Sequence, residues 1–96
     1  MRNSNEQSLK EVIQDLLNAY RLRGKLKEVK LVNSWGKVMG KTIANRTTEV
    51  FVRDRTLYVR ILSSPLKQEL HYNRTKVIKM LNDEVGEEVI NNLVIL

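Results

Sequence analysis

The chain is 96 residues long, has a net charge of +6 and contains no cysteine. This length corresponds to one domain, and the lack of cysteine excludes disulfides, thiolate metal sites and thiol catalysis. An apolar content of 42% indicates a folded globule rather than a disordered segment. The sequence has neither a membrane-length apolar run nor a signal-peptide core, so we expect a cytoplasmic protein without a membrane partner.

The charge is unevenly distributed along the chain. Residues 21–60 contain eleven lysines or arginines and three acids, whereas residues 80–96 contain four acids and no base. A basic middle with an acidic end can steer a polyanion to one side of a molecule. Nucleic acid is therefore the expected partner, and a basic surface that serves solubility alone is the alternative.

The first segments predict a short lead-in and a helix. Residues 1–7 are polar and should form a flexible lead-in to a single domain over residues 8–96. Ser8 and Glu11 match a capping box, which marks a helix start. An apolar stripe at helical spacing follows, made of Leu9, Val12, Ile13, Leu16, Leu17 and Tyr20. Gly24 follows two arginines, which predicts the end of this helix.

A second helix is predicted over about residues 26–45, with a break near Gly36 or Gly40. Its apolar face includes Trp35, the only tryptophan, which we expect to be buried between this helix and a sheet. Gly36, Gly40 and Ala44 form a line of small residues along one face. Such a line usually lets another backbone pack closely, and contact with a ligand or nucleic-acid backbone is the alternative.

Two strands are predicted at residues 48–52 and 57–61, because β-branched and aromatic residues alternate there with period two. Residues 53–56 should connect them as a hairpin. Ser64 as N-cap and Pro65 at the first helical position then predict a helix of roughly 20 residues ending at Gly86.

This long helix carries Leu70 on its apolar stripe, and residues 89–96 should form a buried last strand. The order is ααββαβ, an α+β fold with a three-stranded mixed sheet and helices packed on one face. If the last strand joins the same sheet parallel to the second, the crossover should be right-handed.

No catalytic constellation is evident in the sequence. His71 has no plausible carboxylate partner, and capping explains Ser63 and Ser64 fully. The acids near the C-terminus lack the spacing of a calcium-binding loop. We therefore predict no enzyme, no cofactor, no metal and no small-molecule substrate.

Basic residues of the hairpin and of the long helix are the predicted nucleic-acid contacts, namely Arg53, Arg55, Arg60, Lys67 and Arg74. Lysine and arginine gain binding free energy at phosphates chiefly through counterion release, which reads no sequence. Phe51 and Tyr58 lie on the predicted strands, where they either face outward and stack on bases or pack in the core.

A set of residues spread along the chain resembles the DciA-like family of bacterial proteins. The matching residues occur in the same order as in the family and at nearly the same spacing. They are Trp35, Gly40, Ile43, Ala44, Thr47, Leu57, Val59, Ser63, Ser64, Glu69, Leu70, Leu81 and Asn82. The resemblance extends over residues 9–96. Leu66 stands where members often have a second tryptophan.

This resemblance implies a KH-like fold, DNA binding, and a role in loading or assisting the replicative helicase at replication initiation. The expected partners are single-stranded or forked DNA, with RNA as the alternative nucleic acid, and the helicase itself. Interfaces concentrate their energy in a few aromatic or arginine anchors, and the exposed candidates here are Tyr72, Arg74 and Arg55. A non-catalytic RNA-binding or protein-interaction module of KH-like fold is the alternative.

Overall fold

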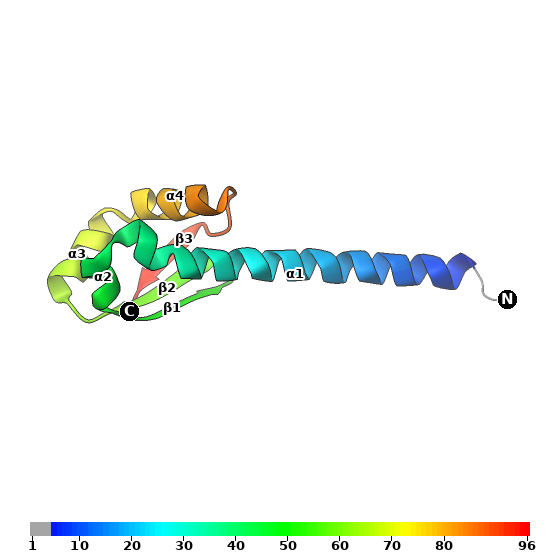
Figure 1. Cartoon of the computed structure of the whole chain (residues 1–96), viewed down its shortest axis with the longest axis horizontal. Helices are drawn as coiled ribbons and strands as arrows, with labels where there is room; N and C mark the ends of the chain where they lie inside the picture. Colours follow the sequence, from blue (N-terminus) through cyan, green and yellow to red (C-terminus); the bar gives the residue numbers. More distant parts are fainter. Residues whose placement is uncertain (1–4) are drawn as a thin grey trace.

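The computed structural model describes the backbone of residues 5–96 and the side chains from residue 8 onward. Its elements are, in chain order, α1 (Asn5–Met39), α2 (Lys41–Asn45), β1 (Thr47–Arg53), β2 (Thr56–Ile61), α3 (Ser64–Tyr72), α4 (Arg74–Val85) and β3 (Asn92–Ile95) (Figure 1). The predicted α+β class, with helices and a three-stranded mixed sheet, is confirmed. Of the predicted lead-in, residues 1–4 lie outside the described residues and residues 5–7 already belong to α1.

The sheet has the strand order β1-β2-β3. β1 and β2 pair antiparallel, and β2 and β3 pair parallel, as predicted for a crossover between them. The hairpin turn consists of Asp54 and Arg55, because Arg53 and Thr56 already pair across the strands. Both turn residues have left-handed backbones, with φ of 51° and 58°. This geometry matches the right-handed twist of the two strands.

The core lies between the sheet and the helices. Its buried residues are Leu31, Trp35, Leu57, Val59, Ile61, Leu70, Val77, Leu81, Ile90 and Leu93. Trp35 is only 3% exposed, and its Nε1 donates a hydrogen bond to Thr47 Oγ1 at 3.0 Å. The prediction that Trp35 is buried is therefore confirmed, and its polar edge is satisfied by β1.

The N-terminal half contradicts the predicted pair of helices. α1 runs without interruption through Gly24, and it begins at Asn5 rather than after a cap at Ser8. A Cβ placed on Gly24 would meet nothing within 4 Å, so no close packing requires a glycine there. The helix ends instead before Gly40, whose φ of 91° is left-handed. Of the two predicted break points near the end of the helix, Gly40 is the observed one.

The predicted line of small residues does not run along one helix. Gly40 separates α1 from α2, and the short α2 folds back so that Ala44 faces Gly36. A Cβ on Gly36 would lie 3.6 Å from the Ala44 Cβ, an ordinary van der Waals contact. The small residues therefore permit a tight α1–α2 corner beside Trp35.

The predicted 20-residue helix is two helices, α3 and α4, divided at Asn73. The Asn73 side chain donates its Nδ2 hydrogen bond to the Glu69 carbonyl at 2.9 Å, which satisfies the end of α3. The N-cap of α3 is Ser63, whose Oγ accepts from the Leu66 amide, so the predicted cap at Ser64 is wrong by one residue. Gly86, with φ of 96°, ends α4 as predicted.

The molecule is elongated, with extents of 67 × 21 × 19 Å. The last turns of α1 pack on the sheet and on α4, and the first part of α1 projects away from the globular part as a single helix (Figure 1). All side chains from residue 8 to residue 26 are exposed, and Leu31 is the first buried one.

Candidate nucleic-acid interface

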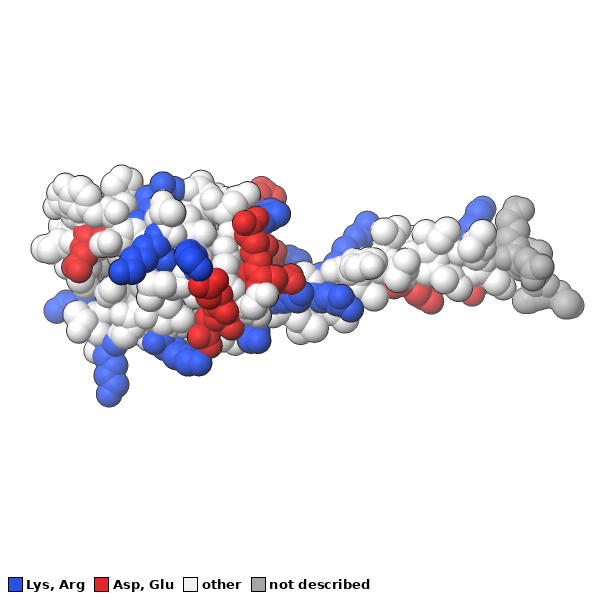
Figure 2. Space-filling model, turned by 90° about the horizontal axis from the view of Figure 1, so that it is seen from above, with Lys and Arg blue, Asp and Glu red and all other residues white. Residues whose placement is uncertain are grey.

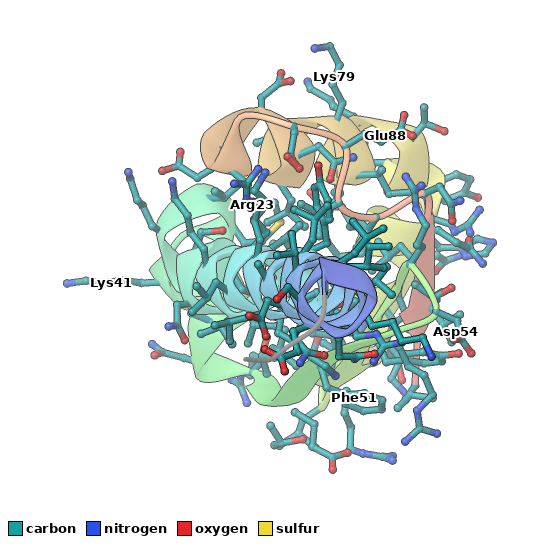
Figure 3. The ribbon with its side chains drawn as sticks, turned by 90° about the vertical axis from the view of Figure 1, so that its right-hand side faces the viewer. Arg23, Lys41, Phe51, Asp54, Lys79 and Glu88 are labelled. Atoms are coloured by element: carbon teal, nitrogen blue, oxygen red, sulfur yellow. The ribbon has the colours of Figure 1, made fainter. Side chains whose placement is uncertain are left out.

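The outer face of the sheet carries two aromatic rings. In β1, Val50 and Val52 face the core, so the residue between them, Phe51, faces outward. By the same alternation Tyr58 faces outward from β2, because Leu57 and Val59 are fully buried. Figure 3 shows Phe51 pointing away from the helical side of the molecule. Of the two alternatives left open by the sequence, the outward orientation is the observed one.

The two rings form a stacked pair across the strands. Phe51 and Tyr58 are register partners, their ring centroids lie 5.0 Å apart, and their planes are inclined by only 11°. Val94 pairs with Tyr58 on the other side, so an apolar row crosses all three strands. Phe51 is 36% exposed. A partly exposed aromatic surface of this kind offers a platform on which a base can stack.

Two predicted arginines lie on the same outer face. The guanidinium of Arg53 lies over the Phe51 ring, 6.0 Å from its centroid. Arg60 donates from its Nε to Glu49 Oε2 at 2.6 Å, so its charge is partly compensated. Arg53 forms no ion pair with any of the described residues. Its charge is therefore available to a phosphate beside the aromatic pair.

The other predicted nucleic-acid residues lie elsewhere. Arg55, at the hairpin tip, donates to the Glu88 carboxylate at 2.9 Å and to the Glu88 carbonyl at 3.2 Å. Lys67 is half-buried on α3 and, together with His71 and Ile95, lines a surface hollow. The five predicted residues thus form no single patch, and only Arg53 and Arg60 share the sheet face with the aromatic pair.

Arg74 begins α4, whereas Lys67 lies on α3, because the predicted long helix is divided at Asn73. Its Nε donates to the Leu93 carbonyl at 3.1 Å, and its Nη2 donates to the Asn92 side chain. These bonds tie the start of α4 to β3. The half-buried guanidinium of Arg74 therefore has a structural role.

The separated charges of the sequence meet in three dimensions. The acids that follow α4 or end it pair with bases from the middle of the chain, in the pairs Lys27–Glu87, Lys37–Glu84 and Arg55–Glu88. Figure 2 shows acidic side chains at the end of the globular part nearest the projecting helix, next to basic ones. The acidic end of the sequence therefore neutralises part of its basic middle, and the expected charge separation is reduced.

Of the predicted partner contacts, Tyr72 is the most accessible, because it ends α3 with 81% of its surface exposed. Among the described residues no group of three or more histidines, cysteines or acids is placed to hold a metal ion. Within the same part of the chain, no helix is long and apolar enough to cross a membrane.

The model of a protein family described as "Dna[CI] antecedent, DciA" matches residues 8–95 of the chain. The chain belongs to the DciA family. Membership implies a helicase-loader type of role in DNA replication, in a family of non-catalytic accessory proteins. No curated protein sequence matches the chain.

The residues that carry the likeness to DciA proteins are mostly structural. Trp35, Leu57, Val59, Leu70 and Leu81 are core residues.

Asn82 is a polar member of the same set, and it holds the loop between α4 and β3. Its Oδ1 accepts from the amides of Val89 and Ile90 at 3.0 and 3.1 Å, and its Nδ2 donates to the Ile90 carbonyl at 2.8 Å. The DciA pattern therefore specifies this fold more than it specifies a contact surface.

Proposed function

We propose that this chain is a DciA-type accessory protein that binds single-stranded or forked DNA together with the replicative helicase, and so assists loading of the helicase at replication initiation. Family membership over almost the whole chain supports the helicase-related role. The aromatic and basic outer face of the sheet supports the DNA-binding part, and it is the single observation that carries it.

The sheet face suits a single strand better than a duplex. Stacking on an aromatic ring requires an unpaired base, and it tolerates every base because each has a π-face. The stacked pair of Phe51 and Tyr58 supplies such a platform, and Arg53 beside it supplies a charge for the adjoining phosphate. Contacts of this kind carry no base-edge readout, so binding should be independent of sequence.

The DNA-binding proposal is tested by fluorescence anisotropy of labelled single-stranded, forked and duplex DNA, with a matched single-stranded RNA, each at several salt concentrations. Arg53→Ala should weaken single-strand binding and reduce the salt slope by about 0.7, the value for one phosphate contact. Phe51→Ala should weaken binding with little change in slope, because stacking releases few ions.

Lys79→Ala is the matched control for charge. Lys79 lies on α4, on the opposite side of the molecule from Phe51 (Figure 3). Its removal changes the net charge as Arg53→Ala does, so any general electrostatic effect appears in both variants. Equal losses in the two variants, or none in either, would contradict a site on the sheet face. Preference for RNA over DNA would favour the alternative of an RNA-binding module.

Membership of the DciA family and the presence of exposed candidate anchor residues support binding to the helicase. Titration of the full chain against the helicase of the same organism should give a complex, and Tyr72→Ala should weaken it about 30-fold if Tyr72 is a principal anchor. Leu62→Ala removes another exposed apolar side chain, 67% exposed, and serves as the control. A folded chain that shows no complex at about 50 µM would contradict helicase binding.

A further inference from the structure

The projecting part of α1 carries an apolar face that nothing in the described part of the chain covers. The predicted stripe of the first helix is present in full, and every member is between 45% and 61% exposed, namely Leu9, Val12, Ile13, Leu16, Leu17 and Tyr20. Single exposed leucines are ordinary on protein surfaces, whereas a contiguous apolar patch marks a surface that another molecule covers.

The size of the patch is in the range that a pair of helices needs. Six large side chains, each about half exposed, present roughly 500–600 Å² per copy, so a pair would bury about 1,000–1,200 Å². This area lies at the lower end of specific protein interfaces. The stripe is about three helical turns long, and an isolated helix of that length is only marginally stable in water.

The stripe maps onto itself under a two-fold axis perpendicular to the helix. Residue numbers paired across its centre add to 29, so Leu9 falls opposite Tyr20, Val12 opposite Leu17, and Ile13 opposite Leu16. A symmetric dimer interface requires this property, because each copy must present the same surface to the other.

Charge favours an antiparallel arrangement. Residues 8–20 hold one base and two acids, whereas residues 21–30 hold five bases and one acid. Parallel helices would place the two strongly basic segments side by side, and their like charges would repel each other. Antiparallel helices place the basic segment of each copy outside the apolar centre, beside the partner's less basic end.

The folded part of the molecule leaves room for such a partner. The packed segment of α1 repeats the spacing of the stripe, since its residues Leu31, Trp35 and Val38 each lie 22 residues after a stripe residue (Leu9, Ile13 and Leu16). Twenty-two residues are about six helical turns, so the stripe and the packed residues lie on nearly the same face of α1. In the antiparallel pair, residues whose numbers add to 29 lie opposite each other. Asn5 of the second helix therefore lies level with Gly24 of the first. The second helix therefore ends before the segment in which α1 packs on its own sheet.

From these observations we propose that the exposed stripe of α1 binds a second copy of this chain, as an antiparallel helix pair centred between Gln14 and Asp15. The two globular parts then lie at opposite ends of one helical rod, and each carries its own sheet face. This inference goes beyond the proposed function and is independent of DNA or helicase binding.

Sedimentation equilibrium of the full chain between about 1 and 100 µM tests the proposal. The mass should rise toward that of a dimer, and Leu16→Asp should weaken self-association at least 100-fold by placing a carboxylate in the apolar centre. Leu22→Asp is the matched control, since Leu22 is 61% exposed on the opposite face of the same helix, and it should leave self-association unchanged. A monomer at every concentration, or equal effects of both substitutions, would overturn the proposal.

Cysteine cross-linking tests the direction of the helices, because the chain has no native cysteine. Leu9→Cys and Tyr20→Cys should each remain uncross-linked alone and should form one disulfide-linked dimer when mixed before oxidation. Parallel helices would instead link each variant to itself, and that result would overturn the antiparallel pair. Circular dichroism checks that every variant stays folded.

Discussion

The two halves of α1 have the same kind of sequence and different surroundings. Leu31 and Trp35, near the C-terminal end of the helix, are 0% and 3% exposed, whereas Leu16 and Leu17 in the projecting half are 55% and 45% exposed. Both halves have an apolar stripe at helical spacing. An apolar stripe at helical spacing therefore identifies the face of a helix that is covered by another element, but it does not identify that element.

This difference has energetic consequences. In the packed half, burial against the sheet and α4 stabilises the helix, as tertiary packing does for most protein helices. Within one molecule, the projecting half is stabilised only by helix propensity and by side-chain pairs along the helix, for example the Gln14–Asn18 hydrogen bond at 3.1 Å. The two halves should therefore respond very differently to the same substitution.

The largest effect is expected at the anchor of the packed half. Trp35→Ala should lower the free energy of unfolding by about 3–5 kcal/mol, because it leaves a cavity and removes the hydrogen bond to Thr47. Urea denaturation followed by circular dichroism measures this, since the only tryptophan is lost. A urea midpoint close to that of the parent would refute the core role of Trp35.

A direct comparison of the halves comes from leucine truncation at two positions of one helix. Leu31→Ala should cost about 2–5 kcal/mol, because Leu31 is fully buried. Leu17→Ala should cost under about 0.5 kcal/mol at protein concentrations low enough to keep the chain monomeric. Equal losses in dilute solution would mean that the projecting half is covered within one molecule.

A smaller loss is expected in the loop next to the packed half. Asn82→Ala should cost about 1–3 kcal/mol, because the amides of Val89 and Ile90 lose their acceptor in a partly buried site. Asn33→Ala, an exposed position on α1, is the control. Denaturant midpoints measure both variants, and indistinguishable values would show that water replaces the Asn82 side chain at no cost.

The smallest effect is expected where the two halves meet. Lys27 pairs with Glu87 at this junction, and both side chains are partly exposed. Glu87→Gln should cost about 0–1 kcal/mol in low salt, and the difference should vanish in high salt because exposed ion pairs are screened. A large loss that persists in high salt would show that the junction depends on packing around Glu87 and not on its charge.

Elements whose signals are local in the chain could be predicted from the amino-acid sequence. Alternation placed Val50 and Val52 on one face of β1 and Phe51 on the other, but only the packing of the sheet showed that Phe51 is on the outer face. A three-stranded mixed sheet and the burial of Trp35 were also predicted from the pattern. The DciA likeness followed from residues that the fold uses as core and cap, which is why it could be read without a structure.

Features that depend on contacts between segments could not be predicted from the sequence and are seen only in the folded molecule. Gly24 is compatible with a helix end and with a helix interior, and α1 continues through it without the positive φ that a glycine cap adopts. Asn73 divides α3 from α4 although no glycine or proline marks the site, because its side chain satisfies the end of α3. The pairing of Lys27, Lys37 and Arg55 with acids distant in sequence likewise arises from packing. Local periodicity fixes which face of a segment is apolar, whereas the contacts between segments fix where each one ends and what covers it.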